Sequence, residues 1–237
     1  MKVDNVEIKL QKPIVDTVAD IIRKKIINGE IRHNLKLSTR LLSEELGISR
    51  TPVREAIRRL ESEGLIDLLP RKGFTVKEYT REKIKEIYSI RKILEVYAAK
   101  LACKNITAKE LNNIRKISIN LNNALQMEKK GILNIEKLNR EFHFAIYDAS
   151  HNETLCEIIK NLWFRVSGLF ITIFSICDRS KMTPREHGRI LRAIEKRNEK
   201  ETEKALEEHL KINEEILLTY YRRRRETELL PRNSFKV

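Results

Sequence analysis

The stretch that decides the fold is Gly47-Ile48-Ser49-Arg50-Thr51-Pro52-Val53-Arg54-Glu55-Ala56-Ile57-Arg58-Arg59-Leu60-Glu61-Ser62-Glu63-Gly64-Leu65-Ile66. Apolar residues at helical spacing precede it. Ser38 is a favourable N-cap for a short helix that ends at Gly47, a residue that tolerates left-handed backbone. A second helix begins almost at once, because Pro52 suits a first helical turn. One face of that helix is apolar: Val53, Ile57 and Leu60. The spacing therefore predicts two short helices joined by a tight turn.

The opposite face of the second helix is basic and polar. Its outward residues are Arg50, Thr51, Arg54 and Arg58. A helix in the major groove presents its N-terminal residues to base edges, and arginine can bond two acceptors of guanine at once. Arg50 and Arg54 are therefore candidates for base contacts. Ser49 and Thr51 suit phosphate or base contacts, since a helix N-terminus favours anions. The pattern indicates a DNA-binding helix-turn-helix.

A β-hairpin is expected directly after these helices. An extended segment at 65–69 is followed by the turn Pro70-Arg71-Lys72-Gly73 and by the alternating residues Phe74-Thr75-Val76-Lys77. Its basic tip can reach the minor groove or the DNA backbone. A short helix, a glycine turn and an arginine-rich helix occur in many helical proteins. The hairpin that follows at once favours DNA binding.

These residues resemble the winged-helix domain of the GntR family of bacterial transcription regulators. The resemblance is carried by residues 49–56, 60–61, 63–66 and 71–76. It implies DNA contacts by Arg40 on the preceding helix, by Ser49, Arg50, Thr51, Pro52 and Arg54 on the recognition helix, and by Lys72 and Gly73 at the wing. Arg32-His33-Asn34 replaces the usual Pro-Gly turn of the family. Asn also accepts a turn conformation, so we expect the turn to persist.

Composition and charge favour a soluble protein with an anionic partner. The chain has 237 residues, 41% of them hydrophobic, and a formal net charge of +14. That length suffices for one large or two ordinary domains. The charge favours a polyanion but does not by itself separate nucleic acid from an anionic membrane. The longest apolar run, 162–177, is interrupted by Arg165 and is shorter than the roughly 18 residues of a membrane span. With no signal-peptide core, we expect a cytoplasmic protein without membrane association.

Three cysteines, Cys103, Cys156 and Cys177, are odd in number and widely spaced. They lack the paired spacing of metal or redox motifs. We therefore expect reduced, buried thiols.

Two domains and a basic tail are predicted. Residues 1–78 form the winged helix-turn-helix domain, whose first helix runs from Pro13 to Asn28-Gly29. Residues 79–226 contain one proline and few glycines, so we expect an all-α ligand-binding and dimerisation domain. Its six helices are expected at 81–104, 107–130, 132–150, 153–178, 182–198 and 200–225. Thr107 with Glu110, and Thr183 with Glu186, are interpreted as capping boxes. Residues 227–237 are the tail.

This helical domain resembles the FCD effector domain of the FadR subfamily of GntR regulators. Ile90-Arg91-Lys92-Ile93-Leu94-Glu95, followed by Ala98-Ala99, resembles its opening helix. Six helices are nearer the shorter, VanR-like form. The predicted fold class is mainly α, with a small β wing in the first domain and a helical bundle in the second.

Three of the five histidines are candidates for one inward-facing site. Asn139 and His143 are four residues apart in a predicted helix, so their side chains share a face. His187 and His209 come from later helices. Spacing alone leaves other readings open, because a lone core histidine is the ordinary explanation for His143 and the other two have charged neighbours.

The resemblance implies a metal site. Many FCD domains bind a divalent ion through an Asp, a His four residues later and two further histidines. The ligands here would be Asn139, His143, His187 and His209, with zinc or nickel as the ion. Asn139 stands at the Asp position, and a neutral amide is a weaker ligand. Glu136 is too far along the helix axis from His143 to share the ion.

The resemblance also implies an effector. A small carboxylate would bind the ion, with Arg91 as a second anchor, because arginine can clamp a carboxylate through two bonds. An ordinary surface arginine is the equal alternative for Arg91.

A ligand-responsive transcription regulator is the leading hypothesis. We expect a homodimer that binds a palindromic double-stranded DNA operator, acts as a repressor and is released by the acid. One alternative is a regulator whose pocket is vestigial or structural. A metal-dependent hydrolase is a weaker alternative, because the chain lacks His-Glu-x-x-His spacing, a nucleophile elbow and a phosphate loop, so we expect no enzyme. The run Arg222-Arg223-Arg224-Arg225 is either a solvated end or a contact to DNA phosphates.

Overall fold

The computed structural model describes residues 13–27, 30–31, 38–69, 73–77, 79–127, 131–179 and 181–229. The chain divides into two compact units, Met1–Glu78 and Tyr79–Val237. Both units are mainly helical, and the one sheet in the described residues has two strands. The predicted fold class is confirmed.

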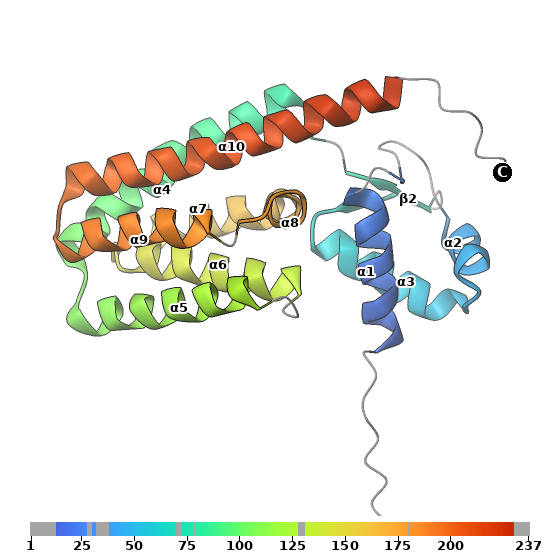
Figure 1. Ribbon diagram of the computed structural model, residues 1–237, viewed down its shortest axis with the longest axis horizontal. Coiled ribbons are helices and arrows are strands. Elements are labelled where there is room, and N and C mark those ends of the chain that lie inside the picture. The colour runs from blue at the N-terminus through green and yellow to red at the C-terminus, as the bar shows by residue number, and fades with distance from the viewer. Residues whose placement is uncertain are drawn as a thin grey trace, which may run out of the picture. The chain divides into compact units, whose positions relative to one another are not determined.

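The described part of the first unit has three helices and two paired strands (Figure 1). Its elements are α1 (Ile14–Ile27), α2 (Thr39–Leu46), α3 (Arg50–Ser62), β1 (Ile66–Leu69) and β2 (Gly73–Val76). The strands are antiparallel, and Ile66 pairs with Val76. Ser38 caps α2 by accepting from the Leu41 amide at 3.2 Å, and Gly47 ends that helix at φ 65°. This is a winged helix-turn-helix. The unusual turn at 32–34 and the wing tip at 70–72 fall outside the described residues.

Helix α1 packs against α3 through both apolar and charged groups. Ile22, Val53 and Leu60 are completely buried. Arg23 is 4% exposed, and its guanidinium donates to both carboxylate oxygens of Glu63 on α3, at 2.8 and 2.9 Å. A planar guanidinium matches a carboxylate in this bidentate way, which fixes orientation as well as distance.

In its described residues, the second unit is a bundle of seven helices. They are α4 (Arg81–Asn105), α5 (Ala108–Gln126), α6 (Ile132–Asp148), α7 (Glu153–Arg165), α8 (Ser167–Ile176), α9 (Met182–Glu195) and α10 (Glu199–Leu229). Figure 1 shows α10 running alongside α4, and α5 alongside α6, as their contacts require. Helix α9 packs on α10, so α4, α6, α9 and α10 enclose a common interior. Cys103 and Cys156 are buried there as free thiols, and Cys177 is half-buried.

The expected single helix at 153–178 is wrong, because the chain bends by 60° between α7 and α8. Val166 leaves helical geometry at φ −121° and ψ 16°. The bend lets the rings of Trp163 and Phe170 stack at 4.1 Å, whereas residues seven apart in a straight helix are separated by about two turns. No single described helix has the length and hydropathy of a membrane span, and α7 with α8 meets those criteria only as a bent pair.

One of the two predicted capping boxes is correct. Thr107 and Glu110 bond reciprocally at the start of α5. The box predicted at Thr183 and Glu186 is wrong: α9 begins at Met182, its N-cap makes no side-chain capping bond with any described residue, and Glu186 bonds elsewhere. At the other end of the unit, α10 extends to Leu229 and so includes the run of four arginines predicted as the start of a mobile or DNA-contacting tail.

The Arg23 ion pair leads to a prediction about the stability of the first unit. Arg23→Met should lower the free energy of unfolding by roughly 3 kcal/mol, the low end for a broken buried pair, because Arg59 still faces Glu63. Native-state hydrogen exchange of the α1 and α3 amides measures the change. The double variant Arg23→Met with Glu63→Leu is the control and should recover most of the loss. Equal protection in Arg23→Met and wild type would contradict the prediction.

Candidate functional site

The outward face of α3 carries the residues expected to contact DNA. Arg50, Thr51 and Arg54 are exposed, whereas Val53 and Leu60 on the opposite face are completely buried. The helix is therefore amphipathic in the predicted sense. Packing of the buried inner face fixes the position of this helix, so its exposed arginines project from a rigid element. Base recognition requires such an arrangement.

Of the remaining predicted DNA contacts, those in the described residues lie on α2, at the start of α3 and at the start of β2. Ser49 occupies the N-cap position of α3 with extended backbone, and its hydroxyl makes no capping bond in the described part of the chain. Pro52 is half-buried in the first turn. On α2, the Arg40 side chain is 57% exposed and pairs with Glu44 at 2.9 Å, a surface pair weak enough to exchange for a phosphate. Gly73 begins β2 at φ 90°. Lys72 lies outside the described residues.

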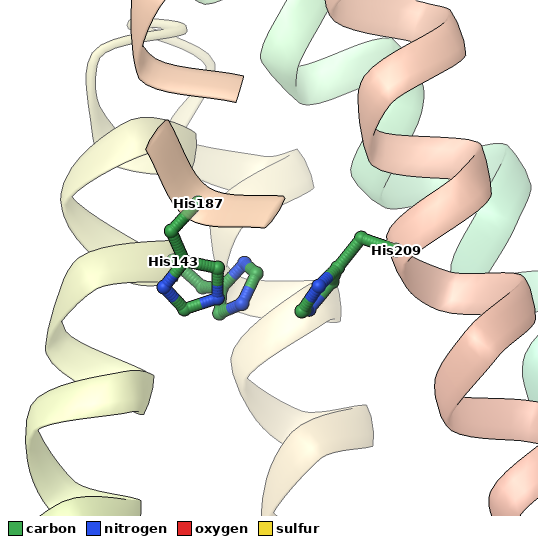
Figure 2. A group of neighbouring side chains, drawn as sticks. All are labelled: His143, His187 and His209. Atoms are coloured by element: carbon green, nitrogen blue, oxygen red, sulfur yellow. The ribbon is translucent and has the colours of Figure 1, made fainter. Parts of the chain in front are cut away.

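Three histidines meet inside the second unit (Figure 2). His143 comes from α6, His187 from α9 and His209 from α10, and they are 1%, 0% and 3% exposed. Their ligand nitrogens all lie within 4.8 Å of one another, and the ring centroids are 4.9 to 5.0 Å apart. The structure therefore brings together the three histidines named from the sequence.

Hydrogen bonds fix the tautomer of His143. Tyr147 donates its single proton to Glu95 at 2.5 Å, and its oxygen lies 3.2 Å from Nδ1 of His143. Glu95 also accepts hydrogen bonds from Arg91 and Trp163. An ionised carboxylate accepts hydrogen bonds and donates none, so it matches this set of donors. The Tyr147 oxygen is thus left to accept from Nδ1–H. The lone pair of His143 is on Nε2.

A second carboxylate orients His209 in the same way. Glu186 Oε2 lies 2.7 Å from Nδ1 of His209 and also accepts from Arg179 at 2.7 Å. Although burial raises the pKa of Glu186, the bond from His209 and the charge of Arg179 outweigh burial and leave the pKa lowered. Nδ1 therefore carries the proton, and Nε2 accepts from the Asn213 amide at 3.1 Å. That amide must turn aside before Nε2 can bind an ion.

His187 has no hydrogen-bond partner for either ring nitrogen among the described residues. Its ring stacks on Phe142 at 4.3 Å. Burial, followed by the neighbouring imidazoles and arginines, lowers the pKa of both His143 and His187 well below the ordinary value. Both rings are therefore neutral, the form that binds metals. An unpartnered buried nitrogen costs about 1–3 kcal/mol, which a bound ion would offset. The three histidines fit a divalent transition-metal ion, for which neutral imidazole is an ordinary ligand.

The fourth predicted ligand remains a prediction. Asn139 is 4% exposed on α6, one turn before His143, so its amide belongs to the inner face of that helix. Glu136, the nearest acid on the same helix, pairs with Arg140 at 2.9 Å. This pairing agrees with the expectation that Glu136 does not serve as a ligand.

Arg91 is not the surface arginine of the alternative reading, because it is only 1% exposed. Glu95 accepts two of its bonds, at 2.6 and 3.3 Å. Its guanidinium also packs over the rings of Tyr88, Trp163 and Phe170 at 4.6 to 5.0 Å. Only Nη1 lacks a partner in the described structure, so any role as an effector anchor rests on that nitrogen.

Sequence reasoning missed the groups that support the histidines. These are Glu95, Tyr147, Trp163, Arg179 and Glu186. Charged residues in amphipathic helices ordinarily face water, so the pattern gave no sign that Glu95 and Arg179 are buried and that Glu186 is largely covered. The one available signal was the four-residue spacing of Arg91 and Glu95, which puts both on one face of α4.

Comparison with known families gives two matches that together span most of the chain. The model described as "Bacterial regulatory proteins, gntR family" matches residues 14–76, and the model described as "FCD domain" matches residues 86–211. The HTH-type transcriptional regulator McbR of Escherichia coli (strain K12) is 31% identical over 210 residues, covering 87% of this chain and 93% of McbR. LutR of Bacillus subtilis (strain 168) is 31% identical over 221 residues, covering 83% and 97%.

Solved structures give the same result. "E. coli McbR/YncC" matches with a TM-score of 0.59 at 27% identity, covering 90% of this chain and 99% of that one. A GntR family member from Pseudomonas syringae pv. tomato str. DC3000 matches with a TM-score of 0.54 at 25% identity, covering 92% of each chain.

The tautomer of His143 can be tested through Tyr147. Tyr147→Phe removes the acceptor of Nδ1–H, so both tautomers should appear and zinc affinity should fall about 10- to 100-fold, as for other residues that orient metal ligands. Ring ¹⁵N shifts of the metal-free protein and competition with a chelator measure the two effects. Tyr97→Phe is the control, because it removes a hydroxyl from a side chain of α4 that is 54% exposed. Unchanged tautomer and affinity in Tyr147→Phe would contradict the assignment.

Proposed function

The chain belongs to the GntR family of bacterial regulatory proteins and carries an FCD domain, and from this premise we propose a homodimeric repressor that leaves a palindromic operator when a small acid binds. Members of the family are DNA-binding transcription regulators and not enzymes, so the hydrolase alternative is not favoured. The observation that carries the proposal is the exposed basic face at the start of α3. We place the protein in the cytoplasm, where an operator is accessible.

The reading mechanism follows from the geometry of α3. Arg50 and Arg54 are one turn apart on the exposed side, so both can reach base edges from a helix lying in the major groove. Arg40, Ser49, Thr51 and the wing residues bind phosphates and set the register. One helix reaches only a few base pairs, which is why a dimer reading two half-sites gains specificity.

The second unit supplies the response. His143, His187 and His209, with Asn139, would hold zinc or nickel. A bound ion of this kind would offer a positively charged open position for a carboxylate. Arg91 contributes its one unpartnered nitrogen as a second anchor. An acid that binds one arrangement of this unit better than another shifts the protein toward that arrangement.

A structural pocket is the second candidate, and a specific contact favours it. Asn213 already donates to Nε2 of His209, the nitrogen that an ion would need. Asn139 also provides a neutral amide at the position of a carboxylate ligand. Both features suit a regulator whose histidine cluster binds no metal. Metal content decides between the two.

The DNA-reading role of α3 gives one prediction. Arg50→Ala and Arg54→Ala should each weaken specific operator binding by about 1–3 kcal/mol, because each loses contacts to base edges. Fluorescence anisotropy against the operator and a random duplex measures both affinities. Arg115→Ala, which removes an exposed arginine on α5, is the control and should bind normally. Equal losses on operator and random DNA would show that these arginines contact phosphates instead.

The metal centre gives another prediction. Protein purified without chelator or affinity-tag metal should contain close to one zinc or nickel ion per chain, and His143→Ala should contain almost none. Elemental analysis by mass spectrometry measures this. His151→Ala is the matched control, because His151 is half-exposed and pairs with Glu110. Wild-type protein without metal would favour the structural pocket and leave DNA binding unaffected.

A further inference from the structure

Ion pairs and a ring contact fix the register between α4 and α10. The contacts that join the two segments include Lys100 with Glu203 and Lys92 with Glu214, each at 2.7 Å, and the ring of Tyr79 with the ring of Tyr221 at 6.2 Å. Residue numbers fall along α4 as they rise along α10, so the helices are antiparallel. The start of α4 therefore lies toward the C-terminal end of α10 (Figure 1).

The face of α4 that meets α10 continues past Lys92 as a row of cations. Lys85 lies seven residues before Lys92, and Arg81 lies four residues before Lys85, so the three share one face of the helix. Lys92 is neutralised by Glu214. Arg81 and Lys85 are exposed and form no ion pair with any residue that the structure describes. Neutralisation thus stops two turns before the start of α4.

The facing side of α10 changes from acidic to basic over the same distance. Tyr221 lies seven residues after Glu214 and so continues its face. Arg222 and Arg223 follow directly, and both are exposed. Among the described residues Arg222 has no ion-pair partner. The antiparallel register therefore brings two cationic segments together where the earlier turns pair a cation with an acid.

Nearby acids do not neutralise this end of the bundle. Glu86 is paired with Lys83 at 3.0 Å. Glu82 follows Arg81 directly and so points about 100° away from it around the helix. Residues 222–228 contain four arginines and two glutamates, which leaves a net charge of 4 − 2 = +2 on the last turns of α10. Like charges held together repel one another, and a polyanion removes that repulsion.

The linker from the DNA-reading unit enters at this same end. Tyr79, which contacts Tyr221, is the first residue of the second unit. In the sequence only Lys77 and Glu78 separate it from Val76, the last residue of β2. Three residues of fully extended chain span at most roughly 11 Å. A weak contact to DNA that is tethered by so short a linker acts at a high effective concentration.

We propose that Arg81, Lys85, Arg222 and Arg223 form a basic end of the helical unit that binds phosphates of the DNA that α3 reads. Lysine and arginine neutralise phosphates without reading sequence, so the contact adds affinity and salt dependence and leaves the choice of operator to α3. Of the two interpretations of the arginine run, a solvated end and a contact to phosphates, the proposal selects the second. It rests on the proposed regulator function, because it adds a second contact to the same DNA.

The test is the salt dependence with which the full chain binds a random-sequence duplex, because such a duplex reports phosphate contacts without base readout. Lys85→Gln with Arg222→Gln removes one cation from each helix. This double variant should lower the slope of log affinity against log salt by about 1–2 per chain, since each phosphate contact contributes roughly 0.9. Between about 50 and 200 mM salt the wild type should therefore lose roughly tenfold more affinity than the variant. Fluorescence anisotropy measures both.

A second double variant controls for net charge. Lys109→Gln with Lys116→Gln removes the same charge from α5, where both lysines are exposed and form no ion pair with a described residue. Its slope should stay close to that of the wild type. Both double variants should keep the wild-type melting temperature, because they change exposed side chains. An equal fall of the slope in the two would mean that net charge and not position determines binding, and would overturn the proposal.

Failure of this contact can be told apart from failure of the proposed function. Wild-type protein that binds no duplex even at low salt would overturn the regulator itself. Normal binding by the wild type with an unchanged slope in Lys85→Gln with Arg222→Gln would overturn the basic end alone. Vesicles of phosphatidylserine and phosphatidylcholine test the other common polyanion. Capture of the wild type but not of that variant, with equal slopes on DNA, would assign these residues to a membrane surface and overturn the proposal.

Discussion

Glu95 is the group on which the interior of the helical unit depends. Its carboxylate is completely buried on α4 and accepts from Arg91 on the same helix, Tyr147 on α6 and Trp163 on α7. Desolvating a carboxylate costs several kcal/mol, and only such a full set of donors offsets that cost. Because Tyr147 donates its single proton to Glu95, its oxygen can only accept a hydrogen bond from His143. The proton position on His143 is therefore determined by Glu95 on α4, through Tyr147. One buried charge thus joins three helices and determines which nitrogen of His143 carries the lone pair.

Glu186 repeats this arrangement on the other side of the cluster. It too pairs with a buried arginine, Arg179, and it too directs the proton of a histidine, His209, to Nδ1. Two acids therefore orient two imidazoles so that both lone pairs lie on Nε2. His187 has no comparable partner in the described structure, and its neutral ring is held by stacking alone. A third ligand that is neutral and unconstrained by hydrogen bonds can adjust to an ion fixed by the other two.

The sequence predicted those features that local physics determines. The amphipathic pattern of α3, its glycine turn and the hairpin were all readable, because periodicity and backbone preference operate within a few residues. The three histidines were named through a family resemblance, and their spacing alone did not place them together. The break at Val166 was missed because an uninterrupted apolar run looks the same in a straight or a bent helix. Arg91 and Glu95 present the spacing of an exposed pair, and only tertiary packing shows that they are buried.

The two buried arginines differ in how many of their donors have partners in the described structure. Arg91 has one unpartnered nitrogen in the described structure, and two of its donors bond to Glu95. Arg179 has two donors without a partner in the described structure, and the Thr183 hydroxyl has no partner there either. These unpaired groups raise the free energy of the ligand-free protein. A ligand that meets these groups binds only the folded arrangement and stabilises it in proportion to its occupancy. Because Glu186 joins α9 to His209 on α10, that stabilisation acts on the packing of two helices and not on a single side chain.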